Sequence, residues 1–228
     1  MGTRRNFIKK TTAGTAALTM GGLVLPKMGY ANILGSNDRI NCAVIGVRSR
    51  AKAHVKAISA FPNAKVLYNC DVDDLIIEEH NAWCQKNIGY VPKVEKDFRK
   101  ILEDKDVDAV FIATPEHWHA PMSIMAMQAG KHVYVEKPCS HNAHENTLLV
   151  AAQKKYNKKV QMGNQQRSAR TSQLAVKEIK EGIIGDVYKG EAYYSNNRGS
   201  IGKGKVIDVP KTLDWDLWQG PAPRTAYK

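Results

Sequence analysis

The sequence lacks the features that would point to a zinc or redox centre, a repeat protein or a membrane-spanning protein. Its four cysteines stand at positions 42, 70, 84 and 139, and no two of them have the C-x-x-C spacing of such a centre. Cys42 and Cys70 lie inside apolar runs, which is typical of buried core cysteines. There are no internal repeats and no low-complexity linkers. The uncharged stretch 11–25 is short and rich in Gly, Thr and Ala, so we expect no stable membrane insertion.

The composition is that of a folded, soluble chain. With 228 residues, 43% hydrophobic and 25% charged, the sequence excludes disorder, collagen and coiled coil as its main organisation. The formal net charge is +12, of which +5 falls in residues 1–31, where five basic residues meet no acidic one. The remaining lysines are scattered along the chain, whereas nucleic-acid binders cluster them on one face. We therefore expect no nucleic-acid partner.

The amino terminus has the organisation of an export signal. Arg4 and Arg5 stand in Thr-Arg-Arg-Asn-Phe-Ile-Lys, the apolar stretch 11–25 follows, and Gly29-Tyr30-Ala31 offers small residues at a cleavage site. The pattern predicts a twin-arginine signal over residues 1–31 and a periplasmic location. A basic N-terminus with a short apolar helix is the alternative. This route carries folded proteins, so a tightly held cofactor can be bound before export. The signal therefore indicates a cofactor.

From residue 39 to 163, apolar runs alternate with helical patterns, which predicts an α/β fold: a Rossmann-type, doubly wound parallel sheet. The expected strands are 40–45, 65–70, 107–113, 132–135 and 160–162. The expected helices are 52–60, 73–87, 97–103, 123–129 and 143–156. After Gly163 we expect a helix over 171–181 and a half-exposed strand over 187–195. Residues 164–228 are interpreted as the start of an α+β substrate domain that this chain does not finish.

The first strand-to-helix turn resembles a dinucleotide site. Gly46 would make the tight turn and Ala51 would allow close packing of the helix, but Arg48 replaces the second glycine. Asp71 lies 71 − 46 = 25 residues further on, at the end of the second strand, where a carboxylate binds a ribose hydroxyl. A helix N-cap is the other interpretation of Asp71. With no base adjacent to Asp71 in the sequence, NAD is favoured over NADP.

Residues 113–138, ATPEHWHAPMSIMAMQAGKHVYVEKP, carry the more specific pattern. Over residues 39–163 the chain resembles the N-terminal domain of the glucose–fructose oxidoreductase/inositol dehydrogenase family (Gfo/Idh/MocA). The resemblance implies that Glu136 contacts the nicotinamide ribose and Lys137 the substrate hydroxyl, and that the peptide before Pro138 is cis. It also implies that further positions lie along the cofactor: Ala113, Thr114, Pro115, His119, Asn164 and Gln165. The signal and the tail Asp-Trp-Asp-Leu-Trp-Gln-Gly-Pro resemble exported bacterial members.

Two departures from the family pattern affect these expectations. The side chain of Arg48 must turn away from the pyrophosphate or bind it through its guanidinium. The family also supplies an Asp and a His from a helix of the second domain, and this chain ends at Lys228, before that helix. Lys137 is therefore the catalytic candidate that remains, and the chain alone is expected to bind NAD weakly and to show no turnover.

Several residues have alternative roles. The histidines at 117, 119, 141 and 144 lack a zinc-site spacing, so no metal is expected. Lys137 could be an ordinary surface lysine, and Trp215 and Trp218 are expected to pack at a domain junction rather than to stack on a sugar.

The leading hypothesis is an exported NAD-dependent oxidoreductase that acts on a sugar, polyol or glycoside hydroxyl. Its partner is then a small carbohydrate, and a homo-oligomer is expected only with a complete second domain. A truncated, non-catalytic dinucleotide-binding module or pseudoenzyme is the alternative.

Overall fold

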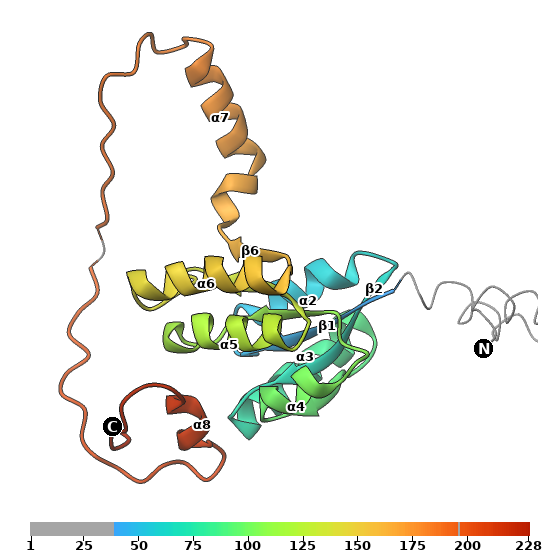
Figure 1. The fold of residues 1–228 in the computed structure, drawn as a ribbon. Coiled ribbons are helices and arrows are strands. Elements are labelled where there is room, and N and C mark those ends of the chain that lie inside the picture. The colour runs from blue at the N-terminus through green and yellow to red at the C-terminus, as the bar shows by residue number, and fades with distance from the viewer. Residues whose placement is uncertain (1–38, 196) are drawn as a thin grey trace, which may run out of the picture. The chain divides into compact units, whose positions relative to one another are not determined.

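The computed structural model describes residues 39–195 and 197–228, and its centre is a six-stranded parallel sheet. The sheet order is β3-β2-β1-β4-β5-β6, with β1 and β4 adjacent where the order reverses. The neighbouring strands β1 and β2 are labelled in Figure 1. The strands are β1 Ile40–Ile45, β2 Ala64–Cys70, β3 Lys93–Glu95, β4 Ala109–Ile112, β5 His132–Glu136 and β6 Val160–Gly163. This is the doubly wound sheet that the alternating pattern predicts. The expected export signal lies outside the described residues.

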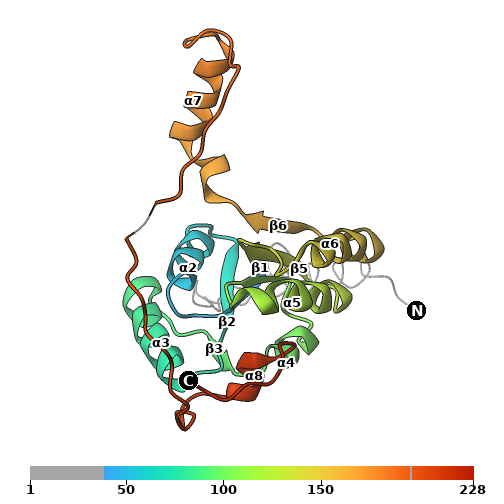
Figure 2. The same cartoon turned by 90° about the vertical axis from the view of Figure 1, so that its left-hand side faces the viewer.

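Helices cover both faces of the sheet, so its strands are buried on two sides. They are α2 Ala51–Ser59, α3 Asp74–Ile88, α4 Phe98–Glu103, α5 Glu116–Gln128 and α6 Ala143–Tyr156. Figure 2 shows α2 and α3 on one side of the sheet and α5 and α6 on the other. Successive residues of β1 point to opposite faces: Cys42 and Val44 pack with α2 and α3, whereas Ala43 and Ile45 pack with α4, α5 and α6.

Side-chain caps fix where the helices begin. Asp73 accepts the Leu75 N–H at 3.1 Å before α3. Asn142 accepts the Glu145 N–H at 3.0 Å before α6, and Glu145 in turn accepts the His141 N–H. Each contact satisfies a backbone donor that has no partner within the helix. At the other end of α3, the chain turns at Gly89 with φ 79°, a conformation that favours glycine.

The local structure differs from the sequence-based expectations in three places. Helix α5 begins at Glu116 rather than 123, because Pro121 is accommodated inside the helix and does not end it. The short strand β3 was not predicted. The expected strand 187–195 is wrong for its described residues, which are exposed and have no paired strand to supply hydrogen-bond partners.

After the sheet domain, the described residues 164–195 and 197–228 hold three short elements. They are the 3₁₀ turn η2 Gln165–Ser168, helix α7 Arg170–Lys180 and helix α8 Trp215–Gln219. Helix α7 buries no residue, and its apolar Leu174, Val176 and Ile179 are exposed. It therefore adds nothing to the core of the sheet domain. The four cysteines are free thiols. No helix within 39–195 and 197–228 has both the length and the apolar character needed to cross a membrane.

Candidate functional site: a dinucleotide cavity

A cavity of about 600 Å³ lies at the carboxyl ends of β1, β2 and β4. This is the edge of a doubly wound sheet where ligands bind. Six of the residues predicted to contact the cofactor line it: Gly46, Arg48, Asp71, Ala113, Thr114 and Pro115. The structure thus brings together residues from three loops that are far apart in the sequence.

Gly46 makes the close approach that a dinucleotide turn needs. Its φ is +84°, and a Cβ at this position would lie 2.7 Å from the carbonyl carbon and oxygen of Ala113 and from the Thr114 nitrogen. The two loops are tied to neighbouring strand ends, because the Gly46 N–H donates to the Cys70 oxygen and the Ala113 N–H donates to the Ile45 oxygen, each at 2.8 Å. A side chain at position 46 would collide with the Ala113–Thr114 backbone, so only glycine allows the two loops to pack this closely.

Asp71 points into the same turn and is not the N-cap of α3, a role taken by Asp73. One carboxylate oxygen accepts the Val47 N–H at 2.8 Å, and the other accepts the Val72 N–H at 2.8 Å and the Asp73 N–H at 3.3 Å. Burial raises the pKa of Asp71 despite these three bonds. The carboxylate therefore sits fixed beside the turn, where its free acceptor sites can receive ribose hydroxyls.

Basic side chains line the cavity that contains Asp71. The sequence shows no base adjacent to Asp71, so these side chains were not expected near it. Arg48 is exposed at its rim, and Lys96 also lines it. The Lys96 amine is already paired with Asp74 at 2.7 Å. Arg48 occupies the position of the second glycine, and its side chain is exposed. The turn therefore accommodates an arginine at this position without burying its side chain.

Glu136 is the last residue of β5 and is only 5% exposed. Arg50 Nε donates to its Oε1 at 2.7 Å, and Gln165 Nε2 donates to its Oε2 at 3.0 Å. His54 Nε2 lies 3.2 Å from the same Oε1. Burial opposes the charge on Glu136, but the bond and charge of Arg50, together with Gln165 and His54, outweigh it and lower the pKa of that carboxyl. Burial lowers the pKa of His54, whose ring faces the pair.

The sequence did not reveal the role of Arg50. It stands in the turn between β1 and α2, lines the cavity, and links that turn to Glu136, which lies 86 positions away. A second arginine two residues after Arg48, directly before the helix, was the available signal. Ala51 is fully buried at the start of α2, as close packing of the helix requires.

His119 is buried, and both of its ring nitrogens contact backbone carbonyls, those of Thr114 and Pro138. It thereby ties the end of β4 to the turn after β5. That turn holds Lys137, which is exposed, and a cis Lys137–Pro138 peptide. Asn164 is exposed beside Gln165. These residues do not line the 600 Å³ cavity; they lie toward β5 and β6, on the other side of β1 from Asp71.

The other histidines do not assemble a metal site in the part of the chain that the structure describes. There, no group of three or more His, Cys, Asp or Glu side chains is arranged to hold a metal ion. His117 instead contacts the backbone oxygen of Trp218 through Nε2 at 2.8 Å.

The fold, the glycine turn and the fixed acid after β2 together define a dinucleotide-binding Rossmann domain. The family model for the oxidoreductase family with an NAD-binding Rossmann fold matches residues 40–164. The chain belongs to this family, Gfo/Idh/MocA.

Individual relatives agree with this assignment. A "Glycosyl hydrolase family 109 protein" of Shewanella pealeana is 29% identical over 191 residues, which is 82% of this chain and 39% of that protein. A second protein of that name, from Shewanella sp. strain ANA-3, is 31% identical over 81% of this chain. The chain spans 39% of the length of both relatives.

Solved structures show the same fold. Scyllo-inositol dehydrogenase from Lactobacillus casei, with bound NAD(H) and scyllo-inositol, is 28% identical and gives a TM-score of 0.57 over 65% of this chain and 43% of that one. Myo-inositol 2-dehydrogenase from Lactobacillus plantarum is 25% identical, with a TM-score of 0.58 over the same shares.

Proposed function

We propose that the protein is an exported, NAD-dependent oxidoreductase that acts on a hydroxyl group of a sugar, polyol or glycoside. The observation that carries the proposal is the pairing of the Gly46 turn with the fixed Asp71 carboxylate. A carboxylate at this point receives two ribose hydroxyls, and its charge repels the phosphate that distinguishes NADP. Lys96, a cation that lines the same cavity, is held by Asp74. NAD is therefore the preferred cofactor.

In the proposed reaction, several residues of this chain have separate roles. Bound NAD supplies the acceptor for a hydride from the substrate's carbinol carbon. Lys137, exposed in the turn after β5, takes the hydroxyl proton as the C–H bond breaks. Glu136 is held by Arg50 and Gln165. It binds the nicotinamide ribose and so positions the nicotinamide beside the turn that carries Lys137. His119 supports the same turn from beneath through the Pro138 carbonyl.

The test is oxidation of a panel of sugars, polyols and glycosides, followed by the absorbance of reduced nicotinamide. In a full-length parent that carries the complete second domain, Lys137→Ala should lower turnover by about 100-fold, the usual scale of general acid–base catalysis. It should leave NAD affinity unchanged, because Lys137 lies away from the Gly46–Asp71 cavity. Lys154→Ala, at an exposed position on α6, is the matched control. Normal turnover by Lys137→Ala would remove this residue from the mechanism.

A second candidate reaction is hydrolysis of a glycoside through transient oxidation. The names of the Shewanella relatives favour it. Oxidation of a sugar hydroxyl to a ketone acidifies the neighbouring C–H, and loss of that proton expels the aglycone. Water would then add to the double bond left by the aglycone, and the bound cofactor would return its hydride to the ketone. This reaction releases aglycone with no net reduced nicotinamide, whereas a dehydrogenase accumulates one reduced cofactor per turnover.

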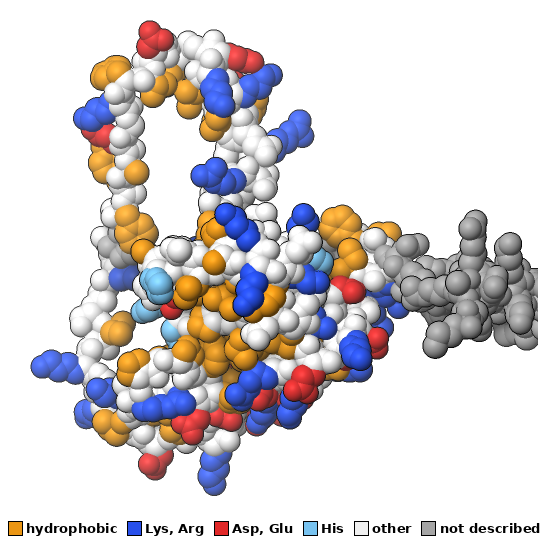
Figure 3. All heavy atoms as spheres, in the orientation of Figure 1, with side chains coloured by type: hydrophobic (Ala, Val, Ile, Leu, Met, Phe, Trp, Pro, Cys, Tyr) orange, Lys and Arg blue, Asp and Glu red, His pale blue; other side chains and the backbone are white. Residues whose placement is uncertain are grey.

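A non-catalytic dinucleotide-binding module is the alternative from another class. Tight NAD binding with no turnover on any substrate would select this alternative. A nucleic-acid partner is disfavoured, because Lys and Arg are interspersed with acidic and apolar side chains on the face drawn in Figure 3.

A further inference from the structure

Residues 212–228, which we call the C-terminal strap, are joined to the loop that follows β2. The Asp74 N–H donates to the Thr212 oxygen at 3.0 Å, and the Asp214 N–H donates to the Val72 oxygen at 2.9 Å. Between them, Leu213 and Asp73 form an antiparallel bridge. Backbone pairing of this kind fixes both the direction and the register of the strap against the domain.

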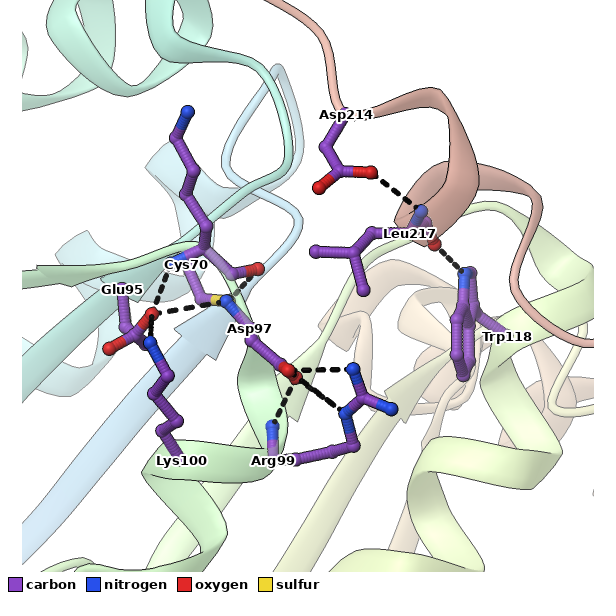
Figure 4. A network of polar contacts seen from close by, with 9 residues as sticks. Cys70, Glu95, Asp97, Arg99, Lys100, Trp118, Asp214 and Leu217 are labelled. Carbon is purple, nitrogen blue, oxygen red and sulfur yellow. Dashed lines mark hydrogen bonds and ion pairs between the residues drawn. The ribbon is translucent and has the colours of Figure 1, made fainter.

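Trp118, in the first turn of α5, provides a second anchor. Its Nε1 lies 3.0 Å from the Leu217 oxygen and 3.1 Å from the Trp218 oxygen, and Asp214 caps the Leu217 N–H (Figure 4). The strap then passes directly over the indole at Gly220. A Cβ on Gly220 would fall 1.9 Å from the ring, and φ there is +51°. Docking of the strap therefore requires glycine at this position.

These anchors place the strap over one end of the dinucleotide cavity. Leu213, Trp215 and Leu217 line the same cavity as Gly46 and Asp71. In the sheet order, β2 lies on one side of β1, and β5 with its Lys137 turn lies on the other. Because the acid after β2 receives the adenosine ribose in folds of this class, the strap covers the adenosine end and leaves the nicotinamide end open.

The strap is ordered by its own contacts, so it forms a wall before any ligand arrives. Trp215 and Trp218 stack with ring centroids 4.7 Å apart, and Tyr227 packs edge-on against Trp215. The buried Gln219 accepts the Thr225 N–H through Oε1 at 2.6 Å, which closes the strap on itself. A fixed apolar wall suits a purine ring, which gains by leaving water for a flat hydrophobic surface.

We propose that the C-terminal strap is the outer wall of the adenosine subsite and holds the adenine against the loop that follows β2. This inference rests on the proposed binding of NAD and adds to it a structural element that lies about 140 residues beyond Asp71 in the sequence. The strap contributes affinity for the half of the cofactor that does not react.

Gly220→Ala tests the proposal, because it displaces the strap without touching the ligand. Titration calorimetry would compare ADP-ribose, which lacks nicotinamide, with nicotinamide mononucleotide, which lacks adenosine. We expect ADP-ribose and NAD to bind about tenfold more weakly, equivalent to about 1.4 kcal/mol. Nicotinamide mononucleotide should bind as before. The matched control is Gly182→Ala, where φ is +88° but nothing lies within 4 Å of the added Cβ.

Leu213→Ala provides a second variant that shortens a cavity-lining side chain and keeps the strap's backbone pairing. It should weaken ADP-ribose selectively as well. Equal loss of both ligands would overturn the proposal, because the strap would then support the whole domain. Tighter ADP-ribose binding by Gly220→Ala would overturn it too, since the strap would then block the subsite. If the unmodified protein binds NAD but neither variant changes ADP-ribose affinity, the strap inference fails alone; if it binds no NAD, the proposed function fails.

Discussion

Replacing Gly46 by Ala should destabilise the protein through two separable effects. The first is backbone strain, because φ is +84° and L side chains rarely adopt this conformation. The second is a collision, because the new Cβ would sit 2.7 Å from three main-chain atoms of Ala113 and Thr114. Main-chain atoms cannot rotate away as a side chain can, so β1 and β4 or their loops must move apart.

Gly89→Ala separates the two effects. Gly89 has a φ of +79°, close to that of Gly46, but nothing lies within 4 Å of its Cβ position. We expect Gly89→Ala to cost the strain alone, about 1–2 kcal/mol. Gly46→Ala adds overpacking of about 1–3 kcal/mol, for a total of about 2–5 kcal/mol. The larger value is a substantial part of the stability of about 5–15 kcal/mol that a domain possesses.

Urea unfolding at one pH, followed by far-ultraviolet circular dichroism, gives the free energy of unfolding of both variants and the parent. NAD titrations of the folded variants give the second measurement. Gly46→Ala should lose NAD affinity as well as stability, whereas Gly89→Ala should bind NAD as the parent does. Equal losses of stability in the two variants would show that the Ala113 backbone yields at little cost, and the close approach would then not explain the glycine.

Three further predictions concern the cofactor, the export signal and the stability at low pH. Asp71→Ala should weaken NAD binding by about 1–3 kcal/mol, the loss of a charged hydrogen-bond partner, and Asp71→Asn should narrow the preference for NAD over NADP; wild-type protein that binds NADP as well as NAD would contradict the role of Asp71. Replacing Arg4 and Arg5 by Lys should leave the protein in the cytoplasm with its N-terminal segment uncleaved, as read by fractionation and immunoblotting; unchanged periplasmic accumulation would remove the export proposal. Burial, helped by the charge of Lys52, lowers the pKa of His80 from 6.5 to about 4. Between pH 6.5 and about 4 the unfolded chain therefore binds a proton that the folded chain does not, and the free energy of unfolding falls as the pH is lowered. His80→Leu should flatten that part of the urea-unfolding profile, and an unchanged slope would show that His80 is not the group responsible.

The sheet domain was predictable because its local signals and its tertiary environment agree. Strands buried on both faces appear as continuous apolar runs, so β1 was found at its observed bounds. Where local and tertiary effects differ, prediction failed. Pro121 disfavours a helix locally, yet α5 continues through it, with its buried residues packed in the core on both sides of the proline. Val187 and its neighbours alternate like a strand, but a strand also needs a neighbour to pair with, and alternation does not supply one.

The candidate site was also predictable only in part. Spacing alone located Gly46 and Asp71, because the turn and the end of the next strand are fixed by the β-α-β unit. No spacing rule connects Arg50 with Glu136, but physical chemistry requires some partner: a carboxylate 5% exposed cannot stay charged without donors. Arg50 and Gln165 supply them and hold both oxygens of Glu136. Any hydroxyl that Glu136 binds must therefore share the carboxylate with these two donors, and the Arg50 bond couples the turn between β1 and α2 to the end of β5.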